Sequence, residues 1–305
     1  MPEIKEIRKF ADFIRNKIIN KEIIKISILK GRYKKHGPFT NFNIIKKSLP
    51  LTVKEVNTKG KFLYITFDNK LYLFNTLGLT GGWCYLKNGS DKYEFSKNLK
   101  DYSKFLPKEQ IMAYIKNATN HLNIEFKTNH GSLYYFDVMS FGSLKIVNSI
   151  EELNNKLKKL GPDIMEKNTD FNLFKTQITK SVNLEKEIGL VLINQKIISG
   201  IGNYLRSDIL YISKINPFRK VKNLKDNELL IIYKNSKILT WYDYDKNKAI
   251  KLNIINKNIK LPSDYNRLFY IYNEKIDIYG NKILKKELYN GNHKRFIYYV
   301  PKIQK

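Results

Sequence analysis

Cysteine and histidine are both scarce in this chain of 305 residues, which has one cysteine, Cys84, and four histidines. A single cysteine excludes an internal disulfide framework. The histidines are scattered along the chain, whereas a structural zinc site needs about four cysteine or histidine ligands close together. We therefore expect no zinc ion in this protein.

Long apolar segments are missing as well. No run in the sequence approaches the ~18 apolar residues of a membrane-spanning helix, and charged residues such as Lys5 and Arg8 interrupt the first segment. We expect a protein that does not enter a membrane and that works inside the cell. Nothing in the sequence identifies the compartment.

Acidic residues are outnumbered by basic ones, with 28 aspartates and glutamates against 56 lysines and arginines. The resulting formal net charge of +28 calls for a polyanionic partner. Hydrophobic residues make up 42% of the chain, which is enough for a folded core and argues against a disordered basic tail. The length predicts about two domains.

The first half of the chain has the pattern of a β-sandwich or barrel that follows a helix. Apolar residues between Pro2 and Ile19 recur at three- and four-residue spacing, which predicts a helix with one buried face. Turn residues at 68–69 and 129–131 place hairpins between paired strands. The predicted strands are residues 23–29, 62–67, 71–74, 122–126 and 133–136.

The second half is predicted to be mainly helical. The composition changes around residues 148–172, where Gly161-Pro162 ends a predicted helix at 153–160, so we place a domain boundary there. The Lys-, Asn- and Ile-rich segment 221–266 predicts little. The remaining predicted elements are helices at 184–195 and 204–214 and a terminal hairpin within 269–299.

The first residues offer a nucleophile. If Met1 is removed, Pro2 begins the chain with a secondary amine, and an α-amino group titrates near ~8, so part of it is unprotonated at neutral pH. Its attack on the anomeric carbon of a sugar gives an iminium ion that eases phosphate elimination, and the adjacent Glu3 is placed to transfer protons. The alternative is that Pro2 and Glu3 only begin a helix, where both residue types are favoured.

A glycine-rich turn, Gly200-Ile201-Gly202-Asn203, precedes the predicted helix at 204–214. Glycine lets the backbone approach a phosphate, and we expect Asn203 to cap the helix while its side-chain amide reaches the same phosphate oxygen. The alternative is an ordinary turn between two helices.

The most specific pattern surrounds this turn. The run from Ile193 to Tyr211, followed by Ile215-Asn216-Pro217-Phe218, resembles the helix–two-turns–helix motif of the formamidopyrimidine-DNA glycosylase and endonuclease VIII family. Only residues 221–266 stay unaligned with that family. Further segments that resemble the family, in the same order, are Met1–Glu3 with Glu6, Lys59–Leu63, Leu77–Gly81, Asp137 with Phe141-Gly142, and Leu160–Asp163.

The resemblance implies an α+β fold with two domains. The first would be an N-terminal helix plus an antiparallel β-sandwich, and the second a helical domain with the helix–two-turns–helix motif and a β-hairpin finger. We expect the catalytic domain at 1–148, a linker at 149–172, the DNA-binding domain at 173–268 and the finger at 269–305.

The resemblance also implies residue roles in catalysis. Pro2 would be the covalent nucleophile, Glu3 the proton-transfer group at the sugar ring, and Lys61 a phosphate ligand beside them. In a chain so rich in lysine, Lys61 is alternatively a solvated strand residue.

Other residues are implied to bind the DNA around the extruded nucleotide. Asn203 and Arg295 would hold phosphates, Gly202 belongs to the same phosphate-binding turn, and Glu6 is a candidate for the wall of the base pocket. The role of Arg295 depends on the resemblance between residues 295–300 and the second strand of the family's zinc finger.

The finger lacks the means to bind zinc. Ile276, Tyr279, Val300 and Ile303 stand at the positions of the four cysteines of bacterial members. The resemblance is therefore to the zincless finger of animal relatives, and we expect hydrophobic packing to replace the metal.

Leu79, Met139 and Phe141 stand where the family fills the space left by an extruded base. Met139 takes the place of an arginine that reads the opposite base, and it offers no hydrogen bond to a base edge. We expect weak opposite-base discrimination and tolerance of single-stranded DNA, where extrusion costs least. Alternatively, a basic residue from 221–266 reads the opposite base.

The implied function is a bifunctional DNA glycosylase and abasic-site lyase. It would remove oxidised bases, mainly pyrimidines and hydantoins, through a Schiff base at Pro2 with β- and δ-elimination. We expect no cofactor, a monomer, and damaged DNA, double- or single-stranded, as the partner. The alternative from another class is a non-catalytic basic DNA-binding protein on the same scaffold, such as a lesion sensor or packaging factor. Only the enzyme needs a free amine at Pro2.

Overall fold

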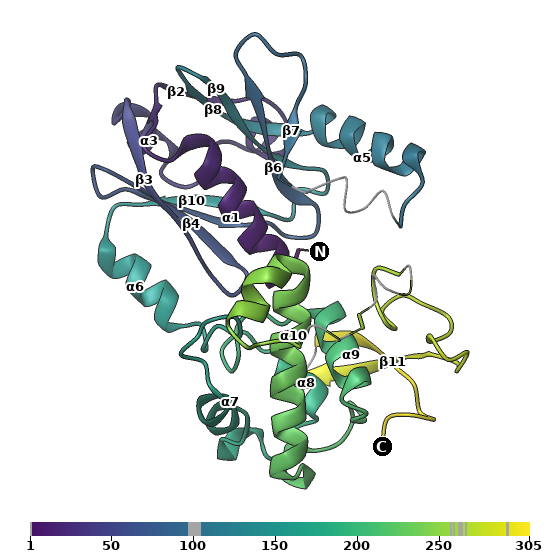
Figure 1. Cartoon of the computed structure of the whole chain (residues 1–305). Coiled ribbons are helices and arrows are strands. Elements are labelled where there is room, and N and C mark those ends of the chain that lie inside the picture. The colour runs from purple at the N-terminus through teal and green to yellow at the C-terminus, as the bar shows by residue number, and fades with distance from the viewer. Residues whose placement is uncertain are drawn as a thin grey trace. The chain divides into compact units, whose positions relative to one another are not determined.

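The computed structural model describes residues 2–96, 105–256, 258, 260–261, 265, 267–290 and 293–305. The chain forms two compact units, whose elements are labelled in Figure 1. The first unit contains Pro2 and Glu6–Lys158, and the second contains Glu3–Lys5 and Lys159–Lys305. Each unit has its own hydrophobic core.

The first unit contains the antiparallel β-sandwich that the sequence predicted. The strand order is β1-β3-β4-β5-β10 in one sheet and β2-β8-β9-β6-β7 in the other. The strands are β1 (Glu22–Ile23), β2 (Lys25–Ile28), β3 (Leu51–Lys59), β4 (Phe62–Phe67), β5 (Tyr72–Thr76), β6 (Gly81–Lys87), β7 (Glu94–Phe95), β8 (Leu122–Thr128), β9 (Gly131–Asp137) and β10 (Ser143–Val147).

The opening helix, α1 (Ile4–Ile18), follows its predicted apolar pattern. Ile7, Phe10 and Ile14 are at most 4% exposed and pack into the core of the first unit. Ile4 is equally buried but belongs to the core of the second unit. The other helices of the first unit are α2 (Gly31–Lys35), α3 (Phe42–Lys47), α5 (Lys108–Asn120) and α6 (Ile150–Lys158).

Some strand predictions were wrong. Residues 23–29 form two strands rather than one, because β1 pairs with β3 while β2 pairs with β8 in the other sheet. Strand β3 was missed because a bulge between Val53 and Glu55 interrupts its alternation. Strand β6 was missed because its first five residues are all buried, which removes the alternation altogether.

The second unit is mainly helical. Its helices are α7 (Phe171–Ile178), the 3-10 helix η1 (Ser181–Asn183), α8 (Ile188–Ile193), α9 (Asn203–Ile212), the 3-10 helix η2 (Val221–Asn223) and α10 (Asp226–Lys251). The helix predicted at 184–195 is present, but its predicted bounds were too wide, because only Ile188–Ile193 is α-helical. Helix α10 fills much of the segment for which the sequence predicted little, with a break in its helical backbone at Asp245.

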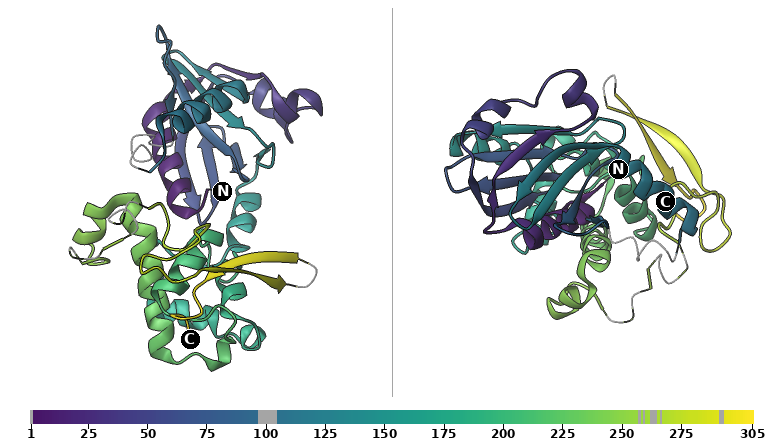
Figure 2. Two further views of the ribbon diagram at one scale, coloured as in Figure 1. Left: turned by 90° about the vertical axis from the view of Figure 1, so that its right-hand side faces the viewer. Right: turned by 90° about the horizontal axis from the view of Figure 1, so that it is seen from above.

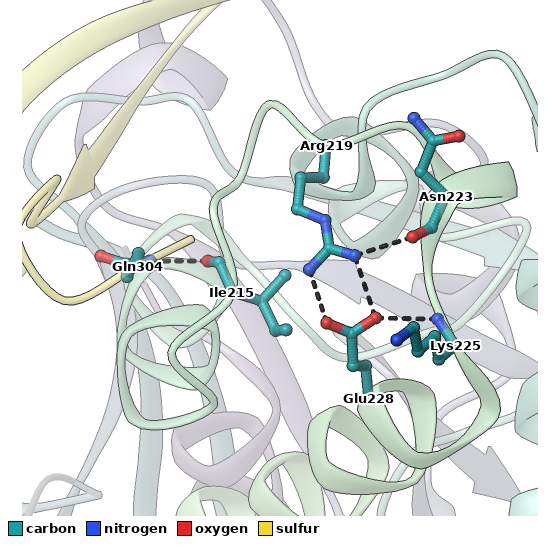
Figure 3. A network of polar contacts seen from close by, with 6 residues as sticks. All are labelled: Ile215, Arg219, Asn223, Lys225, Glu228 and Gln304. Atoms are coloured by element: carbon teal, nitrogen blue, oxygen red, sulfur yellow. Dashed lines mark hydrogen bonds and ion pairs between the residues drawn. The ribbon is translucent and has the colours of Figure 1, made fainter.

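A polar network holds the start of α10 (Figure 3). Both terminal nitrogens of Arg219 bond the carboxylate of Glu228, at 2.6 and 2.9 Å, and one of them also donates to the carbonyl of Asn223 at 2.7 Å. Glu228 accepts the backbone N–H of Lys225 at 2.8 Å, which completes a cap of the helix. This bidentate pair explains why a lysine- and asparagine-rich segment begins a helix here.

The predicted terminal hairpin is formed by β11 (Leu284–Asn290) and β12 (His293–Tyr299), drawn in yellow in Figure 2. Leu288 and Ile297 bury one face of the hairpin in the core of the second unit. Two residues of the predicted turn, Gly291 and Asn292, lie outside the described residues. Among the helices of the described residues, none combines the length and hydropathy of a membrane span.

Candidate active site

Glu3 lies in the second unit at the start of α9. Its carboxylate accepts hydrogen bonds from the backbone N–H groups of Gly202 at 2.7 Å, Tyr204 at 2.9 Å and Leu205 at 3.3 Å. The residue is 1% exposed. Amides at the start of a helix lack partners within the helix, and the helix dipole favours a negative charge there. Glu3 is thus the anion that this helix start holds.

The predicted cap of α9 is wrong. The N-cap residue is Gly202, and the helix begins with Asn203. The Gly202 amide, which we expected to face a phosphate, donates to Glu3 instead. A β-carbon at Gly202 would lie 2.2 Å from Cδ of Glu3, so the glycine makes room for a protein carboxylate.

The two residues that follow Glu3 also contact the start of α9. The backbone N–H of Ile4 donates to the carbonyl of Gly200 at 3.3 Å. The ammonium of Lys5 lies 5.2 Å from the ring centroid of Tyr204, and Lys5 is 8% exposed. Residues 3–5 are therefore held one after another by the second unit, directly after Pro2 in the chain.

Arg206 positions the side chain of Asn203. This arginine is fully buried and donates to the Asn203 carbonyl oxygen Oδ1, to the Gly189 carbonyl at 2.9 Å and to the Phe296 carbonyl at 2.7 Å. Burial is the main cause that lowers the pKa of Arg206, to about 10. Because Phe296 follows Arg295 in β12, Arg206 connects the two predicted phosphate ligands of the second unit.

Arg295 itself is exposed and lies opposite Leu288 in the hairpin. The charges of Arg295 and Glu3 both act on Arg206, the first lowering its pKa and the second raising it. The structure thus brings three predicted site residues, Glu3, Asn203 and Arg295, together around Arg206.

Asp208 is a second buried charge-bearing residue on α9. It accepts hydrogen bonds from the backbone N–H groups of Tyr270 at 3.2 Å, Ile271 at 3.0 Å and Tyr272 at 3.3 Å. Burial raises the pKa of Asp208 to about 7, although these three amides and the charge of Lys5 act in the opposite direction. Asp208 therefore ties α9 to the segment that precedes the finger.

Arg206 and Asp208 were not predicted as site residues. Their signal in the sequence is that both are charged yet stand in helix α9 beside apolar residues such as Leu205 and Ile209. Buried charges of this kind are rare unless they are hydrogen-bonded.

Pro2, Glu6 and Lys61 belong to the first unit. Pro2 and Glu6 are half-buried at the start of α1, and Met1 lies outside the described residues. Lys61 was expected in a strand, but it follows Gly60, with φ 56°, in the turn between β3 and β4. The neighbouring Lys59 donates to the carbonyl of Leu157 at 2.8 Å.

The three predicted void-filling residues lie on two loops of the first unit that contact each other. Leu79, Met139 and Phe141 are 43%, 48% and 59% exposed. A β-carbon at Gly78 would lie 2.6 Å from the backbone of Phe141, so the loops approach closely only because residue 78 is glycine. The structure places three apolar side chains in solvent on one pair of joined loops.

Asp137 joins these loops. Its carboxylate accepts hydrogen bonds from the Thr80 hydroxyl and the Gly142 backbone N–H, both at 2.6 Å. Thr80 in turn accepts the backbone N–H of Met139 at 2.9 Å. Such charge-assisted bonds hold the backbone of both loops while their apolar side chains stay exposed.

The finger is held partly by packing and partly by a polar cluster. Val300 is fully buried, as expected, but Ile276 and Tyr279 are 51% and 72% exposed, so packing does not replace the metal at these two positions. Their loop is organised by Asp277, which accepts hydrogen bonds from the Tyr279 N–H at 2.9 Å and the Asn281 N–H at 2.7 Å.

Further hydrogen bonds connect the residues before and after the hairpin to the rest of the second unit. Asp277 also accepts from the Asn281 side-chain amide at 2.9 Å and from the Tyr211 hydroxyl at 3.1 Å. Gln304 accepts the Val300 N–H at 2.7 Å and donates to the Ile215 carbonyl at 2.8 Å, a bond drawn in Figure 3. Within the described part of the chain, no three His, Cys, Asp or Glu side chains are grouped as metal ligands.

Comparisons with known proteins agree on one family. Residues 1–144 match the model of the formamidopyrimidine-DNA glycosylase N-terminal domain, and residues 160–240 match the formamidopyrimidine-DNA glycosylase H2TH domain. The formamidopyrimidine-DNA glycosylase of Mycoplasma genitalium is 27% identical over 237 residues, which are 77% of this chain and 72% of that protein. The enzyme of the same name from Ligilactobacillus salivarius is 26% identical over 237 residues, or 77% and 74% of the two chains.

Solved structures share the fold. The Lactococcus lactis formamidopyrimidine-DNA glycosylase bound to DNA with an abasic site has a TM-score of 0.72 at 20% identity, over 99% of both chains. MutM in complex with DNA that contains carbocyclic 8-oxo-G has a TM-score of 0.71 at 20% identity, over 100% of both chains. Since the two family models together cover well over half of the sequence and the same fold extends along the whole chain, this protein belongs to the formamidopyrimidine-DNA glycosylase and endonuclease VIII family.

Proposed function

We propose that this protein is a bifunctional DNA glycosylase and abasic-site lyase that removes oxidised bases, mainly pyrimidines and hydantoins, through the amine of Pro2. Family membership supports a DNA glycosylase of base excision repair. The observation that carries the proposal is the binding of the Glu3 carboxylate by three amides of the α9 start. It gives the residue next to Pro2 a defined place beside Asn203.

In the proposed reaction, the secondary amine of Pro2 attacks C1′ of the damaged nucleotide, and the bond from C1′ to the base breaks as the base leaves with a proton. The amine proton is then lost, and the C1′–O4′ bond of the sugar ring breaks as O4′ takes up a proton. The nitrogen lone pair forms the C1′=N bond of an iminium ion, which acts as an electron sink. Loss of a proton from C2′ then breaks the C3′–O bond, and a later loss from C4′ breaks the C5′–O bond. Glu3 is proposed to transfer protons at the sugar.

Phosphate binding is proposed for Lys61, Asn203 and Arg295. The buried Arg206 supports this role for the last two, because it bonds the Asn203 side chain and the backbone next to Arg295. Glu6 is proposed as part of the base pocket. No metal or organic cofactor enters the proposed steps.

Tolerance of single-stranded DNA and weak discrimination of the opposite base are also proposed. Support comes from the exposed apolar trio Leu79, Met139 and Phe141, which offers no side-chain hydrogen bond to an orphaned base. We expect comparable excision rates opposite each of the four bases, measured with duplexes that differ only at that base. A strong preference for one opposite base contradicts this part of the proposal.

The decisive experiment is borohydride trapping on an oligonucleotide with an abasic site. The full chain, tagged only at its C-terminus, is expected to give a covalent adduct, and peptide mass spectrometry should place the DNA on Pro2. The matched control carries an uncleavable extension before Pro2 and should bind the same DNA without forming the adduct. Binding without any adduct in the unextended protein identifies the alternative, a non-catalytic DNA-binding protein.

A further inference from the structure

The finger hairpin has two chemically different faces. Leu288 and Ile297, at 2% and 0% exposure, point into the core of the second unit. In a hairpin, alternate residues share a face, and the paired register places six side chains on the other one. This outer face consists of Lys285, Glu287, Tyr289, Lys294, Phe296 and Tyr298.

Aromatic rings on the outer face are exposed to solvent. Tyr289 is 61% and Phe296 is 39% exposed, and Tyr298 is half-buried. Tyr298 still packs against the core of the second unit, but Tyr289 and Phe296 are not among the residues that do, so the core does not account for these two rings. Exposed large aromatic side chains beside one another are a feature of binding surfaces.

Lysine ammonium groups flank the same rings. Lys285 Nζ lies 4.5 Å from the ring centroid of Phe296 and 5.7 Å from that of Tyr298, and Lys294 Nζ lies 5.1 Å from that of Phe296. Glu287 pairs with Lys294 and accepts the Tyr289 hydroxyl, which holds both side chains at the surface. Rings and cations thus alternate along the hairpin.

The rings continue from the hairpin to the start of α9. Tyr298 lies 5.0 Å from Tyr272 between ring centroids, and Tyr272 lies 5.5 Å from Phe269 and 6.2 Å from Tyr204. Tyr204 also donates its backbone N–H to Glu3. We call these five rings, from Phe296 through Tyr298, Tyr272 and Phe269 to Tyr204, the aromatic row; all belong to the second unit.

We propose that the outer end of the aromatic row, Phe296 and Tyr298 with Lys285 and Lys294, binds single-stranded DNA. Unpaired bases would stack on the rings as the flexible lysine side chains move from the ring faces to the phosphates. Proteins use this combination of rings and cations for single strands without sequence preference. Duplex DNA would gain only phosphate contacts on this surface, because its bases are already stacked on each other and only a single strand offers free base faces. The net charge of +28 matches a polyanionic ligand.

This proposal deepens the proposed function. Single-strand binding itself does not require glycosylase activity, and only its purpose in repair rests on the proposed function. A single strand held on the row would lead toward Glu3 and keep an unpaired lesion strand near the α9 start. Arg295 lies on the opposite face of β12, so the duplex contact proposed for Arg295 and the single-strand contact are made by different side chains of one hairpin.

The first test measures affinity by fluorescence anisotropy of a labelled oligothymidine and of a duplex of the same length. Phe296→Ala is expected to weaken binding of the oligothymidine about ten-fold, the usual loss for one stacked base, and to leave duplex affinity unchanged. Tyr279→Ala is the matched control, because this ring is 72% exposed on the same finger but lies outside the row. Equal losses on both DNAs, or no loss on the single strand, overturn the proposal.

A second variant measures base stacking by fluorescence. It also keeps the proposal testable if Phe296→Ala does not fold. Phe296→Trp is expected to keep single-strand affinity, and its added fluorescence should be quenched by oligothymidine but not by duplex. Unchanged fluorescence with bound oligothymidine overturns the proposal. Borohydride trapping of the same variants on an abasic duplex separates the two claims: absence of any adduct in the unmodified protein overturns the proposed enzyme, while the anisotropy decides the single-strand site independently.

Discussion

At the scale of single residues, the candidate site depends on a carboxylate inside a helix start. Glu3 uses three amides that would otherwise be available to an external anion, and Gly202 leaves the space for it. Every other residue type would bring a β-carbon onto the carboxylate. Gly202, although it has no ionisable side chain, is therefore the residue at this helix start whose substitution should disturb Glu3 most.

Gly202→Ala is expected to displace Glu3 and to reduce the rate of adduct formation about 100-fold or more, the contribution of a positioned proton-transfer group. The substitution adds no backbone strain, because φ at this position is −116°. The rate is measured by borohydride trapping in single-turnover conditions. Gly280→Ala is the control: it has φ +80° but open space, so it should cost about 1–2 kcal/mol of stability and keep the rate. If the unmodified protein, Gly202→Ala and Gly280→Ala all form the adduct at the same rate, Glu3 does not act as the proton-transfer group.

Asp208 gives a pH dependence of stability with a defined sign. Its pKa is raised to about 7 in the folded protein from an ordinary value near 3.8, so the folded state binds the proton more tightly than the unfolded state. The contribution of Asp208 is fully present below about pH 4 and is lost as the pH rises toward 7. The free energy of unfolding, from urea titrations, should therefore fall over this range relative to that of Asp208→Asn. If the difference in free energy of unfolding between the unmodified protein and Asp208→Asn stays constant with pH, the raised pKa of Asp208 is refuted.

At the scale of structural elements, the finger is a hairpin whose base is closed without cysteine ligands. Asp277 gathers two backbone amides, a side-chain amide and a tyrosine hydroxyl around one carboxylate, and Gln304 closes the other end. Burial acts to raise the pKa of Asp277, but the hydrogen bonds from Asn281, Tyr279 and Tyr211 together hold it below its ordinary value. A carboxylate with several donors thus fixes the loop in which the side chains of Ile276 and Tyr279 stay exposed.

Asp277→Ala is expected to lower the free energy of unfolding by about 1–3 kcal/mol, because it leaves the buried Tyr211 hydroxyl and three part-buried donors without their acceptor. Thermal unfolding followed by circular dichroism measures this. Ile276→Ala, at a neighbouring side chain that is 51% exposed, should change the midpoint little. A chelator should leave the unmodified protein as stable as before. A fall of the midpoint with chelator would instead reveal a metal in the fold.

At the scale of the whole molecule, the net charge of +28 governs how the protein meets DNA. Each phosphate that a basic side chain neutralises releases counterions, so affinity falls steeply with salt concentration. This term acts on all DNA sequences and on both strand forms. The positive charge contributes to DNA affinity in general. The site at α9 is proposed to contribute to catalysis, and the exposed loops to the choice of DNA substrate.

The salt dependence of duplex binding should change by a defined amount when one phosphate ligand is removed. Arg295→Gln is expected to reduce the slope of log affinity against log salt by about 1, with a uniform loss across DNA sequences. Anisotropy titrations at several salt concentrations measure the slope. Tyr279→Ala, which removes no charge, should keep the slope of the unmodified protein, and an unchanged slope in Arg295→Gln would remove the proposed phosphate contact.

Local sequence patterns predicted the helices and strands that are marked by apolar periodicity and turn residues within a few neighbouring positions. The apolar spacing of α1, the strands around the turns at 68–69 and 129–131, and α9 all follow from periodicity and turn residues. Strand β6 has no alternation because both of its faces are buried, and the start of α10 depends on the pair of Arg219 with Glu228. Neither feature is visible in hydrophobic periodicity alone.

The sequence by itself determined the family, the basic character and the adjacency of Pro2 and Glu3, because these reside in residue types and in short, ordered motifs. Only the tertiary structure decided which group occupies the start of α9, since Glu3 and Gly202 are far apart in the chain and meet only on folding. It also decided that Asp277 organises the finger and that rings from separate segments form one row. Such contacts depend on three-dimensional distances, which no spacing along the chain encodes.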